Sequence, residues 1–109
     1  MAETIFQKII DKEIPADIIY EDEKSLVFKD INPVAPTHVL IIPKKQIEKI
    51  SDAEETDQDL LGHLFLVAGK VARQLGVENA FRLVVNNGAG AQQTVFHLHI
   101  HLILSLIHI

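Results

Sequence analysis

The sequence has no cysteine, no basic surplus and no long apolar run, and each absence excludes a class of protein. Without cysteine, the chain can form neither a disulfide framework nor a thiolate metal site, and it has no cysteine nucleophile. Ten basic against fifteen acidic residues give a net charge of −5, which argues against binding nucleic acid or an anionic membrane through a basic surface. No apolar stretch approaches the roughly 18 residues that span a bilayer, and no signal-peptide pattern opens the sequence. We expect a cytoplasmic protein that binds neither nucleic acid nor membrane.

The 109 residues, 48% of them hydrophobic, suffice for one domain with its own core. Runs rich in β-branched and aromatic residues predict strands, and apolar residues at helical spacing predict one short and one long helix. We expect an α+β fold, with helices on one side of a five-stranded antiparallel sheet. The expected helices are 4–12 and 60–75, and the expected strands are 17–21, 25–29, 38–43, 81–86 and 97–103.

Both predicted helices carry boundary signals. Thr4 followed by Gln7 resembles a capping box, and Ser51 followed by Glu54 resembles a second one. Gly76 can end the long helix. A histidine on this helix, His63, is expected to be an exposed or interface residue.

The most informative pattern is a row of histidines, His97, His99 and His101, which alternate with apolar residues. Successive side chains of an extended strand point to opposite faces, so the three imidazoles are expected to share one face. The apolar residues between them would anchor the other face in a core. A separate histidine, His38, stands where a proline-containing loop meets another predicted strand.

Three interpretations of the histidines compete. Two of them at i and i+2, with His38 or His101 as a third ligand, resemble a zinc site. A straight row diverges from a common point, however, and this argues against a metal. The histidines can also be core or surface residues without a role. The third interpretation, nucleophilic catalysis, needs donors for a developing charge and a group that manages the proton.

A glycine-rich loop over residues 87–94 stands directly before the histidine row and also contains amides and a hydroxyl. Exposed backbone N–H groups in such a loop can cradle a phosphate. The Asn87-Gly88 pair alone is more typical of a simple turn. Its position next to three alternating histidines favours the phosphate-binding interpretation.

These segments together resemble a known family. The alternating histidines of 97–103 match the histidine-triad pattern, and 30–45, 60–64, 82–86 and 93–97 are similar to the Hint branch of nucleotide-binding histidine triad (HIT) proteins. The resemblance extends over nearly all of residues 3–103. We therefore expect residues 1–103 to be a single HIT domain.

The resemblance implies a hydrolase that cleaves the P–N bond of purine nucleoside 5′-phosphoramidates, or of acyl-adenylates, through a covalent nucleotidyl-histidine. It implies that His99 attacks the α-phosphorus and that His97 and His38 orient it, with His38 beside the nucleophile. His101 would hydrogen-bond the phosphoryl group and assist the leaving group, and Thr94 would lie near that leaving group. No metal and no cofactor are required.

The same resemblance implies nucleotide contacts. Asp30 would accept the ribose hydroxyls, Ile31 would pack by the base, and Asn86 would lie on the phosphate side. Gln92, where family members often have glycine, and Gln93 with the main chain around it would hold phosphate oxygens, together with Thr94, His99 and His101. From the residues alone, Asp30 could equally stabilise a turn, and Asn86 could belong to a hairpin turn.

The resemblance also implies a symmetric homodimer in which the long helices and the following strand pack across the two-fold axis. Two other functions stay open. The chain could bind purine nucleotides or recruit partners without turnover, or it could act as a dinucleoside polyphosphate hydrolase or nucleotidyl transferase of the same superfamily.

The last six residues, 104–109, depart from the family pattern, which continues with glycines and an arginine. They read Leu-Ser-Leu-Ile-His-Ile, which is the translation of CTG TCT CTT ATA CAC ATC, a transposase end sequence used as a sequencing adapter. They would also prolong an apolar strand edge, which natural proteins avoid. We hypothesise that this tail is not native and that His108 is not part of the histidine row; resequencing the genomic locus would decide this.

Overall fold

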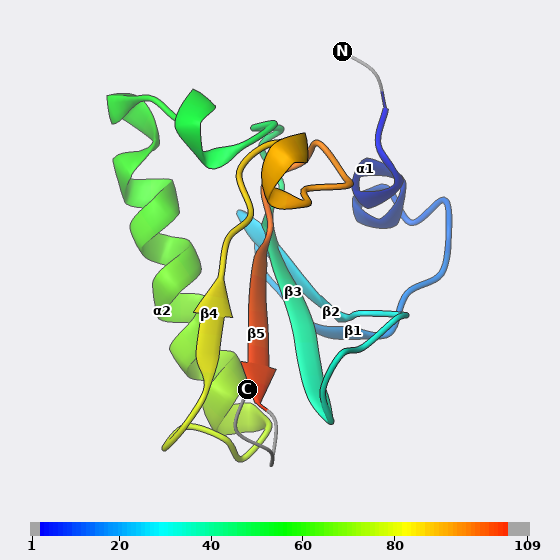
Figure 1. Cartoon of the computed structure of the whole chain (residues 1–109), viewed down its shortest axis with the longest axis vertical. Helices are drawn as coiled ribbons and strands as arrows, with labels where there is room; N and C mark the ends of the chain where they lie inside the picture. The colour runs from blue at the N-terminus through cyan, green and yellow to red at the C-terminus, as the bar shows by residue number, and fades with distance from the viewer. Residues whose placement is uncertain (1–2, 105–109) are drawn as a thin grey trace.

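The computed structural model of the chain describes residues 3–104 (Figure 1). The hypothesis about a non-native tail concerns 104–109, of which 105–109 lie outside the described residues. Within the described range, no helix combines the length and the apolar character that a membrane crossing requires. The elements are α1 (Ile5–Ile10), β1 (Ile18–Glu21), β2 (Ser25–Lys29), β3 (Thr37–Pro43), the 3₁₀ turns η1 (Ile50–Asp52) and η2 (Glu55–Asp57), α2 (Gln58–Gln74), β4 (Arg82–Val84), η3 (Ala89–Ala91) and β5 (Ile100–Leu104).

The five strands form one antiparallel sheet in the order β1-β2-β3-β5-β4, which confirms the predicted fold class. The central strand β3 pairs with β2 on one side and with β5 on the other. Since β5 is the last strand in the sequence, this pairing brings two parts of the predicted site together that are far apart in the sequence. His38 on β3 and His101 on β5 therefore become neighbours.

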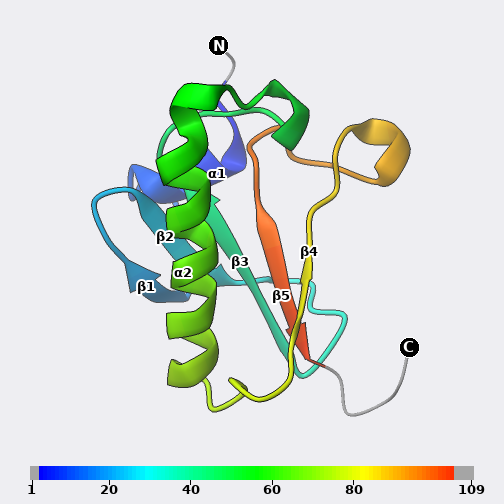
Figure 2. The same cartoon turned by 90° about the vertical axis from the view of Figure 1, so that its left-hand side faces the viewer.

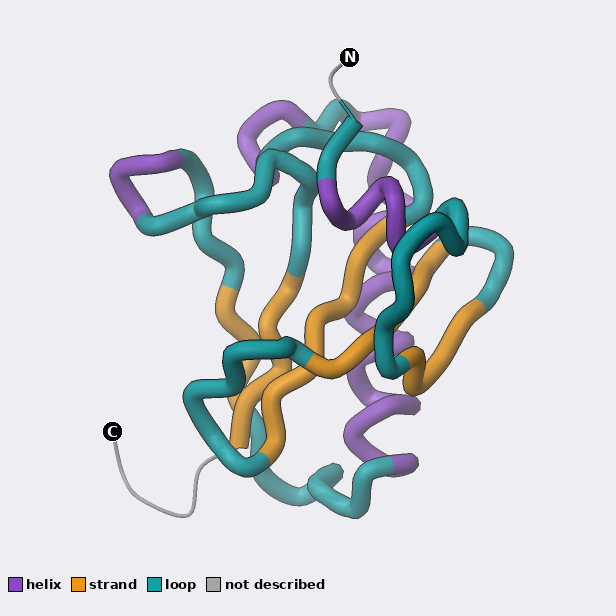
Figure 3. The backbone as a smooth tube through the Cα atoms, turned by 90° about the vertical axis from the view of Figure 1, so that its right-hand side faces the viewer, coloured by secondary structure: helices purple, strands orange, loops and turns teal. Residues whose placement is uncertain are grey.

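The two helices cover opposite faces of the sheet, so the prediction of helices on one side was wrong. The long helix α2 packs on the face that contains Val39 and Ile41, as Figure 2 shows from that side. The short helix α1 packs Phe6 and Ile9 on the other face, which is turned to the viewer in Figure 3. The reason is that β2 and β3 bury consecutive residues on both faces, and one helix can cover only one of them.

Helix boundaries follow local hydrogen bonding. Thr4 caps α1 by accepting a hydrogen bond from the backbone N–H of Gln7 at 3.1 Å. Gly76 adopts φ +75° after α2, as the sequence predicted for its end. The capping box before α2, however, joins Glu54 to Asp57, and the prediction that Ser51 forms it was wrong.

The ladder of β5 begins at Ile100, so His97 and His99 lie before the strand and only His101 lies within it. The register would next place Leu98 opposite Pro43, which has no backbone N–H to donate. Leu98 instead donates its N–H to the carbonyl of Ile47 at 2.6 Å. The prediction of a strand over 97–103 was therefore too long at its start.

Candidate active site

Alternation of side chains persists through the histidine segment. Leu98, Ile100 and Leu102 belong to the core that α2 covers. The rings of His97 and His99 contact Phe6 of α1 on the other face, with centroid distances of 6.2 Å and 5.0 Å. The histidines therefore lie on the face of the sheet that α1 covers. The sequence pattern predicted a shared face for three residues at i, i+2 and i+4.

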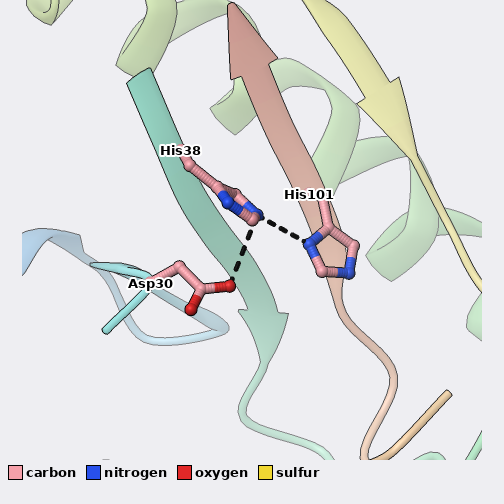
Figure 4. Close-up of side chains that lie close together, drawn as sticks. All are labelled: Asp30, His38 and His101. Atoms are coloured by element: carbon pink, nitrogen blue, oxygen red, sulfur yellow. Dashed lines mark hydrogen bonds and ion pairs between the residues drawn. The ribbon is translucent and has the colours of Figure 1, made fainter. Parts of the chain in front are cut away.

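Asp30, which follows β2, lies close to His38 on β3 and His101 on β5 (Figure 4). The Nε2 atom of His38 lies 2.9 Å from Nδ1 of His101 and 3.3 Å from Oδ2 of Asp30. The other nitrogen of His38 accepts a hydrogen bond from the backbone N–H of Val34 at 3.1 Å. Neutral His38 must therefore carry its proton on Nε2, where it can be donated to His101.

The same logic fixes the proton of His101. Its Nδ1 accepts a hydrogen bond from Nε2–H of His38, so neutral His101 carries its own proton on Nε2. That Nε2 atom is buried and has no hydrogen-bond partner among residues 3–104. The arrangement presents an N–H donor that is not used by the fold.

His99 presents the complementary group. Its Nδ1 donates to the backbone carbonyl of His97 at 2.8 Å, so Nε2 of neutral His99 holds a lone pair. His97 is fixed in turn, because its Nε2 donates to the carbonyl of Pro43 at 2.7 Å. The ring centroids of His99 and His101 are 5.0 Å apart. A lone pair and an N–H donor thus stand on adjacent imidazoles.

The ring of His38 is hydrogen-bonded to His101, and among residues 3–104 no hydrogen bond joins it to His99, beside which the resemblance places it. The main-chain carbonyl of His97 is the group that orients His99. His38 is therefore linked directly to His101, and His97 is linked to His99 through the backbone. The strand register causes this difference. His38 on β3 lies opposite Ile103 on β5 and is therefore diagonal to His101.

Burial lowers the pKa of all three histidines of the row below the ordinary value of 6.5. For His97 and His99, the backbone carbonyls that accept their N–H groups oppose this shift in part. For His101, the positive charges that His99 and His38 can carry add to the effect of burial and bring the pKa to about 4. The neutral form that can act as a nucleophile therefore predominates at neutral pH.

These shifts predict a loss of stability in mild acid. Above the unfolded pKa of about 6.5 the histidines are neutral in both states and add no pH dependence. Below it, the unfolded chain binds protons that the folded chain rejects, so the free energy of unfolding falls until the folded pKa is reached, about 4 for His101. Each proton that the unfolded chain binds and the folded chain does not lowers the free energy of unfolding by about 1.4 kcal/mol per pH unit.

Denaturant titrations between about pH 7.5 and about pH 4.5 measure this loss. Carboxylates can add a slope of the same sign, so the comparison is with His101→Gln, which cannot titrate at that position. The variant should show a shallower decline than the wild type. Parallel curves for the two proteins would contradict the proton linkage at His101.

The loop before the histidine row forms η3 and ends with Gln92 in the left-handed region, at φ +67°. This conformation explains why glycine suits the position, since a side chain is strained there. Gln92 and Thr94 are exposed. The amide of Gln93, which the resemblance places at the phosphate with the main chain around it, is buried and hydrogen-bonded within the protein.

The remaining predicted residues lie as follows. Asp30 reaches His38 but also accepts a hydrogen bond from the N–H of Asn32 at 2.8 Å, so it stabilises a turn as well. Ile31 is 84% exposed, and Asn86 is half-buried. His63 is not brought to the site, because it pairs with Asp22 at 2.7 Å on the side of α2.

A metal ion could use the same cluster. Ligand atoms of Asp30, His38 and His101 all lie within 4.8 Å of one another. The set differs from the i and i+2 pair that the zinc interpretation required. Its two nitrogens face each other and are joined by a hydrogen bond, so a metal would have to displace the proton between them.

One residue beside the histidines has no clear signal in the sequence. Phe6 belongs to an ordinary apolar helix stripe, yet its ring meets that of His99 edge-on at an interplanar angle of 88°. This contact joins residues that are far apart in the sequence, and so only the folded chain reveals it.

Sequence comparisons agree with this geometry. The family model of the HIT domain matches residues 11–105. An uncharacterized HIT-like protein of Synechocystis sp. is 60% identical over 104 residues, which are 94% of this chain and 91% of that protein. A 14 kDa zinc-binding protein of Zea mays is 52% identical over 102 residues, which are 92% of this chain and 80% of that protein.

Solved structures share the fold. A HIT family hydrolase from Legionella pneumophila Philadelphia 1 is similar with a TM-score of 0.91 and 44% identity, over 94% of this chain and 92% of that one. A histidine triad nucleotide-binding protein from Candida albicans is similar with a TM-score of 0.84 and 36% identity, over 92% and 73% of the two chains. Because the family model spans most of the sequence and these relatives match nearly its whole length, the chain belongs to the HIT domain family.

Proposed function

We propose that this protein hydrolyses purine nucleoside 5′-phosphoramidates, and acyl-adenylates, through a nucleotidyl-histidine on His99. The observation that carries the proposal is the pair of fixed tautomers, with a lone pair on Nε2 of His99 beside the N–H donor on Nε2 of His101. Solved relatives named as a HIT family hydrolase and a histidine triad nucleotide-binding protein support hydrolysis of a nucleotide substrate.

The first step forms a bond between Nε2 of His99 and the α-phosphorus and breaks the P–N bond. The anionic substrate raises the proton affinity of the cluster of Asp30, His38 and His101, which takes up one proton as the substrate binds. The departing nitrogen receives a proton from Nε2 of His101 and leaves as an amine. The carbonyl of His97 stabilises the positive charge on the phosphorylated His99 ring by accepting its Nδ1–H.

The second step is hydrolysis. Water attacks the phosphorus, the bond to His99 breaks, and the proton of the water passes to the cluster through His101. The nucleoside monophosphate leaves with both histidines restored. In this proposal Asp30 and Ile31 bind the nucleoside, Asn86 and Thr94 lie near the phosphoryl group, and no metal or cofactor takes part.

Mass spectrometry of the intact protein tests the proposal directly. Incubation with an adenosine 5′-phosphoramidate, in the presence of EDTA, followed by rapid acid quench should add the mass of one AMP group. Peptide mapping should place that group on His99. Release of amine without an adduct, or an adduct on another residue, would refute the covalent mechanism.

We also propose that the protein acts as a homodimer through the outer face of α2. Phe65 and Leu66 are 55% and 71% exposed on this face. Gly62 and Gly69 stand on either side of Leu66 at helical spacing, and open space surrounds the positions where their side chains would be. A second helix can therefore approach closely. In the described sheet, β4 also has an unpaired edge next to this surface.

Leu66→Asp should abolish the dimer, because association would bury a charge in an apolar contact. Size-exclusion chromatography with light scattering should give twice the chain mass of 12.2 kDa for the wild type and the single mass for the variant. Ile18→Asp is the matched control, an equivalent change at an exposed position of β1. A monomeric wild type, or a dimeric Leu66→Asp, would overturn the proposed interface.

A further inference from the structure

The side chain of Gln93 is only 3% exposed, although the residues on both sides of it are exposed. Its Nε2 donates to the carbonyl of Glu48 at 2.7 Å and to that of Val95 at 3.0 Å. Its Oε1 accepts the backbone N–H of Gly88 at 2.8 Å. Both amide donors and the amide oxygen are therefore used to join three separate parts of the chain.

The connection over residues 43–51 anchors more than this one side chain. We call it the scaffold segment. It runs from the end of β3 into η1 and is hydrogen-bonded to the loop and to the histidine segment. Four hydrogen bonds to them come from its backbone groups. They join Pro43 to the His97 ring, Ile47 to the Leu98 N–H, Glu48 to the Gln93 amide and Ser51 to the Asn87 side chain.

The loop between Gly88 and Gln93 needs such an anchor. Gly88 has φ +89° and Gln92 has φ +67°, and the left-handed conformation of Gln92 is strained without support. The backbone N–H of Gln93 donates to the carbonyl of Gly88 at 3.1 Å, beside the bond from Gly88 to Oε1. Gln93 thus closes both ends of the loop and ties them to the scaffold segment.

We infer that Gln93 is a positioning residue, which holds the loop 88–94 in the shape that receives the phosphoryl group of the nucleotide. The inference rests on the proposed function, because that proposal supplies the ligand of the loop. The side chain itself does not contact phosphate, since its hydrogen-bonding groups already have protein partners. It acts instead by directing the loop backbone.

Two substitutions test the fit of glutamine to this site. Gln93→Glu removes both donors and turns a carboxylate toward the carbonyls of Glu48 and Val95. Gln93→Met keeps the length and removes the polar groups, so it loosens the loop without adding charge. The matched control is Gln74→Glu, since Gln74 also donates to a backbone carbonyl, that of Ile19 at 2.9 Å, but on α2.

The experiment compares the binding of AMP and of adenosine by isothermal titration calorimetry. For Gln93→Glu and Gln93→Met, AMP affinity should fall at least about tenfold, while adenosine affinity stays within about twofold of wild type. A residue with a purely structural role would lower both affinities together. Gln74→Glu should leave both unchanged.

Hydrogen exchange in the wild-type protein gives a second measurement, which does not depend on whether a variant folds. The Gly88 amide should exchange more slowly than that of Gly90, which lacks a hydrogen bond among the described residues. Equal exchange at the two glycines would overturn the inference. So would unchanged AMP affinity, or an equal loss of adenosine affinity, in a folded Gln93 variant. A wild type that binds AMP but releases no amine from an adenosine 5′-phosphoramidate would refute the proposed hydrolysis alone.

Discussion

His99→Ala should lower turnover of an adenosine 5′-phosphoramidate by at least about 10³-fold, because no other group can form the covalent intermediate. The adduct detected by mass spectrometry should disappear as well. Affinity for AMP should stay close to that of the wild type, because the ribose contact and most of the proposed phosphate contacts come from other residues. Steady-state kinetics and calorimetry on the same preparation measure both quantities.

The controls separate chemistry from folding. The Ala variant also loses the contact between His99 and Phe6, so its thermal transition must be measured. His99→Gln keeps more of that packing and should be equally inactive. His63→Ala, a change at a histidine on α2, should retain full turnover. Turnover in His99→Ala near the wild-type rate would exclude His99 as the nucleophile. Loss of AMP binding together with turnover would point to a role in binding.

His101→Gln should lower turnover of an alkyl phosphoramidate by about 10² to 10⁴-fold, the range expected for loss of a general acid. The reason is that an alkyl amine is a poor leaving group and must gain a proton as the P–N bond breaks. An AMP ester of an acidic phenol needs no such proton. Its hydrolysis should therefore fall much less in the same variant.

The comparison of the two leaving groups is the decisive measurement. A structural defect from His101→Gln would slow both substrates to the same extent, and equal losses would therefore contradict the role of His101 as proton donor. Because His38 supplies the hydrogen bond that fixes His101, His38→Leu should show the same dependence on the leaving group to a smaller degree. His63→Ala again serves as the control.

The sequence predicted the elements of the fold well, because each has a local cause. Alternating and continuous apolar runs marked the strands, and Gly76 marked the end of α2. The errors have tertiary causes. The two faces of β2 and β3 are both buried, which placed α1 opposite α2, and Pro43 ended a ladder that local pattern would have continued to His97.

For the site, the sequence by itself determined which chemistry was available: three histidines at alternating positions, a fourth at the start of another strand, a glycine-rich loop before them, and no cysteine. The tertiary structure alone decided how those groups are connected. It paired His38 with His101, turned the carbonyl of His97 toward His99 and buried the amide of Gln93 against the scaffold segment. The position of a proton on an imidazole depends on the partner of each nitrogen, and two of these partners, at Pro43 and His38, lie more than fifty residues away in the sequence. Local pattern cannot specify such pairs, because strand register and burial determine them.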